Sequence, residues 1–171
     1  MTNDASFVQF GVSCGIIPSM GKPKVYLDNC CFNRPFDDQS QLLVRLETEA
    51  VLFIQDEIKS GNLELIWSSI LDFENDANPF TTRRDAIRIW RKRSLAVIRP
   101  NAEVKEIARA LQTRNIRLKD SLHIASAVVS QCHFLITTDG KMLNKPVDEI
   151  AIVNPIRFIQ EYEAFKNMRR D

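Results

Sequence analysis

The chain has 171 residues, a length that suits a single domain able to bury a hydrophobic core without cross-links. Apolar residues make up 44% and charged residues 26%, as in soluble globular proteins, and no stretch is long enough to span a membrane. The 23 basic and 22 acidic residues give a net charge of +1, so bulk charge neither indicates nor excludes a nucleic-acid partner.

The four cysteines offer little material for a disulfide framework or a zinc site. None stands in a C-x-x-C pair, Cys30 and Cys31 are adjacent, and the chain has only two histidines. We therefore expect reduced thiols and a cytoplasmic protein, because disulfides are rare in a reducing cytosol.

Residues 1–22 are expected to form a loose extension ahead of the folded domain. The segment from Phe7 to Ile17 is partly apolar, but Asp4 is the only charge before Lys22, whereas a secretory signal carries basic residues ahead of its apolar core. Met20 stands just before the first convincing strand, so a native start at that methionine is an open alternative.

Short apolar strands alternate with helical patterns along the rest of the chain, and Gly, Pro, Ser, Thr and Asn mark most of their ends. In chain order we expect a strand at 24–27, a turn-rich segment at 33–40, a helix at 42–59, a strand at 63–67, a helix from 69 to 78, a helix at 83–93, a strand at 95–98, a helix at 101–113, a helix at 119–131, a strand at 134–137, a strand at 150–153 and a helix at 155–165.

This alternation predicts one three-layer α/β/α domain over residues 23–166, with a tail at 167–171. Its sheet should be mostly parallel, with four or five strands and helices on both faces, because consecutive parallel strands need a crossover that helices supply. The chain contains no internal repeat, low-complexity stretch or linker that would indicate a second domain.

Four acidic residues stand where the ends of these elements can meet. Asp28 and Asp139 each follow a strand, Asp120 stands at a helix start, and Glu74 lies on the helix after the second strand. In a doubly wound sheet such acids converge beyond the carboxyl ends of the strands. Crowded carboxylates repel one another, and Mg²⁺ or Mn²⁺ resolves that conflict. A cation held there can activate a water for attack on a phosphodiester.

Each acid also has a purely structural explanation. Asp28 and Asp139 are consistent with turn residues, and Asp120 is consistent with a helix cap. Glu74 has two aspartates beside it on the same helix, and any of the three can simply face water. The spacing alone therefore leaves the role of the acids open.

Taken together, four ordered segments resemble the motifs of PIN-domain nucleases. They are the strand ending at Asp28, Glu74 on a helix, the run Lys-Asp-Ser-Leu-His-Ile-Ala at 119–125, and Leu-Ile-Thr-Thr-Asp at 135–139. The last two segments are the most specific, and Leu-Asp-Asn-Cys-Cys-Phe-Asn-Arg-Pro-Phe-Asp-Asp at 27–38 resembles a bacterial subgroup. The resemblance covers residues 24–165.

The resemblance implies an α/β/α metal-dependent ribonuclease that cuts single-stranded or structured RNA with Mg²⁺ or Mn²⁺. It implies that Asp28, Glu74, Asp120 and Asp139 are both the metal-binding and the catalytic residues. Many small bacterial members are VapC-type toxins that an antitoxin protein holds in check, so an antitoxin partner and a homodimer are expected, and a membrane partner is not.

Three neighbouring residues bear on this interpretation. Asn29 stands where many members have Thr or Ser, although an amide can still bond a metal-bound water or a carboxylate. Thr138 has a hydroxyl that can orient Asp139 or a water. His123 lies one helical turn from Asp120, and it is either packed on an apolar helix face or close enough to reach the site.

A basic helix follows the Glu74 segment. Arg84, Arg88 and Arg91 share one face at i, i+4 and i+7, while Ile87 and Trp90 should face the core. Such a face binds phosphates through counterion release, so we predict that it contacts RNA. A simply solvated charged face is the alternative.

Other classes of function fit less well. A non-catalytic PIN-like module that binds RNA or protein should have lost some of the four acids. An aspartyl-phosphate phosphatase wants a second aspartate two residues after the first, where Cys30 stands. A phosphate-accepting receiver domain wants clustered acids before its phosphoacceptor, and residues 25–27 supply none.

Overall fold

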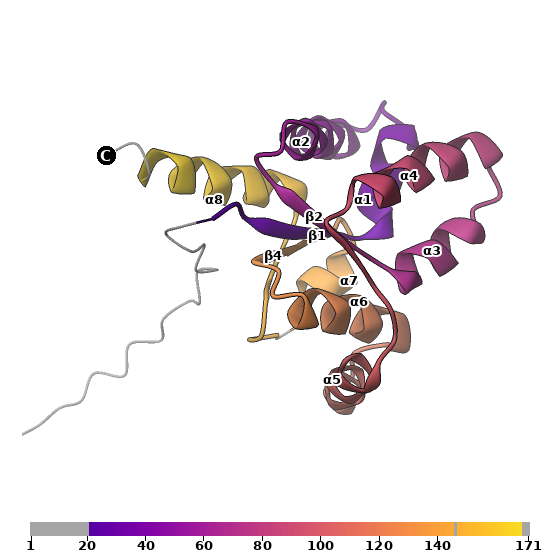
Figure 1. Cartoon of the computed structure of the whole chain (residues 1–171). Coiled ribbons are helices and arrows are strands. Elements are labelled where there is room, and N and C mark those ends of the chain that lie inside the picture. The colour runs from indigo at the N-terminus through magenta and orange to yellow at the C-terminus, as the bar shows by residue number, and fades with distance from the viewer. Residues whose placement is uncertain (1–20, 146, 169–171) are drawn as a thin grey trace, which may run out of the picture.

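The computed structural model describes residues 21–145 and 147–168 (Figure 1). Most of the expected N-terminal extension, the alternative start at Met20 and the last three residues of the expected tail lie outside this range. Within the described residues, no helix combines the length and apolar character that crossing a membrane requires.

The centre of the fold is a sheet of five parallel strands, which confirms the predicted three-layer α/β/α class. The strands are β1 Lys24–Leu27, β2 Glu64–Ser68, β3 Ala96–Ile98, β4 Phe134–Ile136 and β5 Ala151–Val153. Their spatial order is β3-β2-β1-β4-β5, so the chain reverses direction across the sheet between β1 and β4. In such folds this reversal opens a crevice at the carboxyl ends of the two strands.

Helices cover both faces of the sheet, with α2 and α8 on one side and α5 and α6 on the other (Figure 1). The helices are α1 Asn29–Asn33, α2 Leu42–Lys59, α3 Ser69–Asp76, α4 Thr81–Arg93, α5 Ala102–Thr113, α6 Leu118–Val129, α7 Gly140–Leu143 and α8 Pro155–Met168, and a 3₁₀ turn occupies Arg34–Phe36.

Two short helices, α1 and α7, were not among the expected elements. Each begins directly after one of the candidate acids, because the Asp28 carboxylate accepts a hydrogen bond from the backbone N–H of Asn29 and the Asp139 carboxylate accepts one from Lys141. The two acids that follow strands are therefore also helix caps.

Helix α2 has the predicted bounds, and the apolar residues at helical spacing in its C-terminal part, such as Ile54 and Ile58, are buried. Near its N-terminal end Leu42 and Leu46, at the same spacing, are instead 61% and 48% exposed, whereas Glu47 and Thr48 are buried. The cause is the turn at Arg34, whose guanidinium Nε lies 3.0 Å from Glu47 Oε2 and whose carbonyl accepts a hydrogen bond from Thr48. Packing of this turn against α2 rotates polar side chains inward.

The core lies between the sheet and the helices on each side. All three side chains of Val25, Tyr26 and Leu27 on β1 are fully buried, and Trp67, Phe134 and Phe158 pack around them. Each such aliphatic or aromatic side chain contributes about 1.5–3 kcal/mol through burial. This core fixes the carboxyl ends of β1, β2 and β4, where the candidate acids lie.

Candidate metal centre

The crevice between β1 and β4 holds Asp28 next to the segment that follows β4. Leu27 pairs with Ile136 in the sheet, and the backbone N–H of Asp28 donates to the Ile136 carbonyl at 2.9 Å. This continuation of the strand pairing places Asp28 beside Thr137, and the Asp28 side chain is almost fully buried.

Three donors hold the Asp28 carboxylate in one orientation. Its Oδ1 accepts from the backbone N–H of Asn29 at 2.7 Å, and its Oδ2 accepts from the Thr137 hydroxyl at 2.8 Å. The Cys30 thiol donates to the same Oδ2 at 3.2 Å. A buried carboxylate with this many fixed donors is preorganised to bind a ligand.

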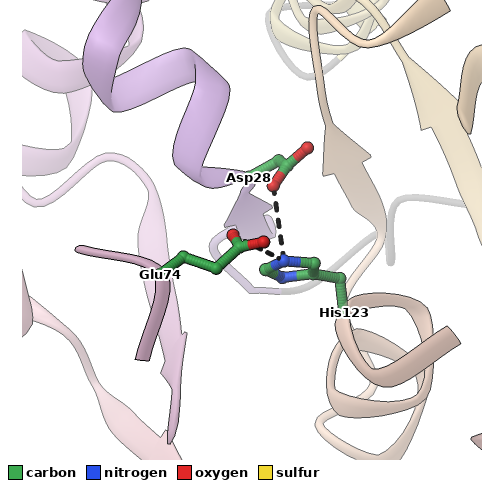
Figure 2. A group of neighbouring side chains, drawn as sticks. All are labelled: Asp28, Glu74 and His123. Atoms are coloured by element: carbon green, nitrogen blue, oxygen red, sulfur yellow. Dashed lines mark hydrogen bonds and ion pairs between the residues drawn. The ribbon is translucent and has the colours of Figure 1, made fainter. Parts of the chain in front are cut away.

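Glu74 of α3 and His123 of α6 complete a compact group with Asp28 (Figure 2). His123 Nε2 lies 3.0 Å from Glu74 Oε2 and 3.6 Å from Asp28 Oδ1. One oxygen or nitrogen from each of the three residues lies within 4.8 Å of the others. We call Asp28, Glu74 and His123 the inner set.

The His123 ring is 2% exposed, and both of its nitrogens have polar neighbours. Nδ1 lies 2.7 Å from the Tyr26 hydroxyl, which in turn hydrogen-bonds Ser68. Burial lowers the pKa of His123, but the hydrogen bond to Glu74 and the charges of nearby carboxylates outweigh it and raise the pKa above its usual value. Burial raises the pKa of Tyr26 well above its usual value, so its phenol stays protonated.

Asp120 and Asp139 form a second group around Arg117, which we call the outer set. Arg117 Nε lies 3.4 Å from Asp120 Oδ2, and Arg117 Nη2 lies 3.9 Å from Asp139 Oδ2. Burial is the largest influence on Asp120 and raises its pKa, Arg117 opposes this rise, and the charges of Asp139 and Asp28 add to it. All four predicted acids are thus electrostatically connected at one edge of the sheet, although the tight contacts involve the inner set.

The fold is similar to that of VapBC2. The similar chain belongs to a crystal structure of VapBC2 from Rickettsia felis bound to a DNA fragment from their promoter, and the match has a TM-score of 0.52. It covers 77% of this chain and 98% of that chain, at 14% sequence identity. No protein-family model and no curated protein sequence matches the chain. At this identity the likeness to VapBC2 establishes the fold alone.

The chemistry of the site fits a hard divalent cation. The inner set offers two carboxylate oxygens and one imidazole nitrogen at close range; Mn²⁺ accepts both types of ligand, and Mg²⁺ accepts oxygens together with waters. Asp120 Oδ2 is buried and accepts no hydrogen bond from a described residue, but the Arg117 guanidinium, with its Nε 3.4 Å away, already supplies a positive charge to this oxygen.

The structure also separates Glu74 from the aspartates beside it on α3. Asp72 accepts from the Trp67 indole at 2.9 Å and from Arg91 at 3.2 Å, and Asp76 pairs with Arg88 at 2.7 Å. Both aspartates therefore point toward β2 and α4 while Glu74 points toward His123.

The predicted arginine face of α4 is partly neutralised by these pairs. Ile87 is buried and Trp90 packs against the core, as predicted. Arg88 and Arg91 are exposed but share their charge with acids of α3, and Arg84 is partly buried, with its backbone carbonyl accepting from Asn75. The face is therefore less basic than the sequence alone indicates.

The contacts of Thr137 and Asn29 at the site differ from those expected from sequence. The predicted supporting hydroxyl was that of Thr138, but its Oγ1 is buried and has no hydrogen-bond partner among the described residues. Thr137 Oγ1 instead donates to Asp28 and accepts from the backbone N–H of Asp139 at 3.0 Å. Asn29 contributes its backbone N–H, and its side-chain oxygen lies 3.4 Å from the Asn33 amide nitrogen. A signal for His123 was available in its spacing of one helical turn from Asp120.

Proposed function

We propose that the chain is a metal-dependent endoribonuclease that hydrolyses RNA phosphodiester bonds by a metal-activated water, with Asp28, Glu74, Asp120 and Asp139 as its metal-binding and catalytic residues. One observation carries the proposal: Asp28 and Glu74, from elements far apart in the sequence, meet within 4.8 Å at the strand-order reversal. The similarity in fold to VapBC2 and the sequence resemblance to PIN-domain nucleases support the same conclusion.

In this proposal the acids hold the cation and their neighbours hold the acids. Mg²⁺ or Mn²⁺ bound there would lower the pKa of a coordinated water and offset the charge that develops on the phosphodiester. Thr137 keeps Asp28 in place through its hydroxyl, and the start of α7 fixes Asp139 through the Lys141 N–H. His123 contacts the carboxylates of Glu74 and Asp28 through Nε2. The Tyr26 hydroxyl contacts Nδ1 on the other side of the ring and fixes its orientation.

We further propose that the protein is the toxin of a toxin–antitoxin pair that binds an antitoxin protein and forms a homodimer. The support is the name VapBC2 on a protein of similar fold together with the resemblance of the sequence to VapC-type toxins. Growth arrest on expression of the chain, relieved by the product of a short gene directly upstream, would test this part.

RNA is proposed to cross the α4 surface through Arg84, Arg88 and Arg91, since α4 packs on the helix that carries Glu74. Replacing all three by alanine should weaken RNA binding and flatten its salt dependence, by a slope of up to about 2 for single strands. Because two of these arginines already pair with acids, a smaller change is expected than for free cations. Titration of a labelled RNA at several salt concentrations measures this, and unchanged binding would remove α4 from the RNA path.

The decisive experiment incubates the purified protein with a pool of single-stranded and structured RNA, with Mg²⁺, with Mn²⁺ and with chelator. Asp28→Asn and Asp120→Asn should abolish metal-dependent cleavage, whereas Asp56→Asn, an exposed acid of α2 that pairs with Lys59, should cleave like the parent. Circular dichroism verifies that each variant folds. No cleavage by the parent with either metal, together with retained RNA binding, would instead indicate a non-catalytic PIN-like module.

A further inference from the structure

A small apolar groove lies on the α5 side of the two helices, α3 and α6, that carry Glu74 and His123. It lies between α3, the end of β3, α5 and α6 and has a volume of about 170 Å³. Its walls include Phe73 of α3, Ile98 and Pro100 after β3, and Leu122 of α6. The groove and the carboxylates share two helices, because Phe73 precedes Glu74 and Leu122 precedes His123 in the chain.

An exposed aromatic ring and a cation stand at the boundary between the groove and the acids. Phe73 is 62% exposed, so its ring is accessible to a ligand from solvent. The ammonium of Lys119 lies 5.5 Å from the centroid of this ring and 3.9 Å from Glu74 Oε1. Lys119 therefore spans the distance between the ring and the carboxylates.

The groove also presents two serine hydroxyls that can accept hydrogen bonds from a ligand. The hydroxyls of Ser69 and Ser126 donate to backbone carbonyls, at 3.3 Å and 2.7 Å, so their oxygens keep the capacity to accept a hydrogen bond. An apolar slot with an exposed ring, hydroxyl acceptors and the Lys119 ammonium beside that ring matches what an unpaired nucleotide needs: a stacking surface, partners for base N–H groups, and a cation for a phosphate.

We propose that this groove binds the base of an unpaired nucleotide adjacent to the phosphodiester held at the carboxylates, with Phe73 as its stacking platform and Lys119 as its phosphate contact. The inference rests on the proposed function, since it assigns a substrate feature, a single-stranded segment, to the same site. The Lys119 ammonium, which lies 3.9 Å from Glu74 Oε1 and 5.5 Å from the centroid of the Phe73 ring, favours a nucleotide over the apolar side chain of a partner protein.

The test compares binding of two fluorescein-labelled decamers, oligoadenylate and an abasic strand with the same backbone, in low salt with chelator so that no cleavage occurs. The parent should bind oligoadenylate more tightly than the abasic strand. Phe73→Ala should weaken oligoadenylate binding roughly 5- to 100-fold and leave abasic binding nearly unchanged, because stacking is lost while phosphate contacts remain. Phe73→Trp should retain the preference.

Phe80→Ala is the matched control, because Phe80 is also an exposed phenylalanine beside a cation, Arg83, at 4.5 Å, and it does not line the groove. It should behave like the parent. The proposal is overturned if Phe73→Ala keeps the full preference for oligoadenylate, if the parent shows no preference, or if the parent binds neither strand.

Cleavage assays run in parallel separate this inference from the proposed function. One outcome is that Phe73→Ala loses the preference for oligoadenylate while the parent hydrolyses no RNA with Mg²⁺ or Mn²⁺. That outcome would support base binding in the groove and reject the nuclease function. Metal-dependent cleavage by the parent, with unchanged binding and cleavage in Phe73→Ala, would support the nuclease and reject the groove.

Discussion

The inner and outer sets of acids are built by different means. In the inner set, Asp28 is almost completely buried and is oriented by a hydroxyl, a thiol and a backbone N–H, none of which carries a charge. In the outer set, Asp139 is partly exposed and lies near Arg117, whose side chain is 58% exposed. Neutral buried donors fix geometry, whereas an exposed arginine can move away. Asp28 of the inner set is therefore held more rigidly than Asp139 of the outer set.

The largest expected contrast between the two sets is in catalysis. Glu74→Gln should lower the metal-dependent cleavage rate by about 10³-fold, because several kcal/mol of charge stabilisation depend on the inner carboxylates. Asp139→Asn should lower the cleavage rate by only about 10- to 100-fold, since the Asp139 carboxylate is more exposed and already accepts a hydrogen bond from the Lys141 N–H at the start of α7. Single-turnover cleavage rates measure both. Equal losses would show that the two sets work as one unit.

A neighbouring pair of threonines tests whether orientation of the inner set matters. Thr137→Val removes the hydroxyl that contacts Asp28 and Asp139, so it should lower the free energy of unfolding by about 1–3 kcal/mol and cleavage by about tenfold. Thr138→Val is the control, because the Thr138 hydroxyl has no hydrogen-bond partner within the described part of the chain. Urea unfolding and cleavage rates measure the two effects. A Thr138→Val variant as damaged as Thr137→Val would contradict the assignment.

The imidazole distinguishes the inner set from a purely carboxylate site. His123→Gln should weaken Mn²⁺ binding by about tenfold or more and change Mg²⁺ binding less, because nitrogen ligands favour Mn²⁺ over Mg²⁺. Titration calorimetry with each metal gives the two affinities. His133→Gln applies the same substitution to the other histidine, whose Nδ1 accepts from the Lys24 backbone. Equal losses for both metals would indicate that His123 only positions Glu74.

The smallest expected effect concerns the cation of the outer set. Arg117→Ala should tighten Mg²⁺ binding roughly two- to fivefold, because a competing positive charge is removed from an exposed position. Arg114→Ala removes a similar exposed guanidinium that pairs with Glu149 instead. Weaker Mg²⁺ binding in Arg117→Ala alone would mean that Arg117 helps to assemble the outer set.

Sequence reasoning predicted the parts of the fold that depend on local pattern. The strand at 24–27 and the helix at 42–59 have the predicted bounds, because an apolar run and a 3.6-residue period specify them directly. The short helices α1 and α7 were missed, since four or five residues are too few to show a period. The burial of Glu47 on α2 was also missed, because it depends on Arg34, which lies outside the helix.

For the candidate site, too, the features that depend on local pattern were predicted and those that depend on long-range contacts were not. The placement of Asp28 and Asp139 at the ends of the neighbouring strands β1 and β4 followed from a doubly wound topology. The contact of His123 with Glu74 joins residues 49 positions apart, and that of Thr137 with Asp28 joins residues 109 apart. A single sequence carries no local signal for such pairs, and the choice of Glu74 over its neighbouring aspartates likewise depends on the orientation of α3.

Helix capping by Asp28 and Asp139 constrains how this protein can diverge. Each carboxylate supports the start of a helix as well as the proposed chemistry, and asparagine caps about as well as aspartate while alanine does not. A lineage that abandoned hydrolysis would therefore drift toward Asn or Ser at positions 28 and 139, whereas Glu74 caps no helix and would be constrained only by its contacts with His123 and Lys119. Retention of Glu74 is accordingly a better marker of an active descendant than retention of either aspartate.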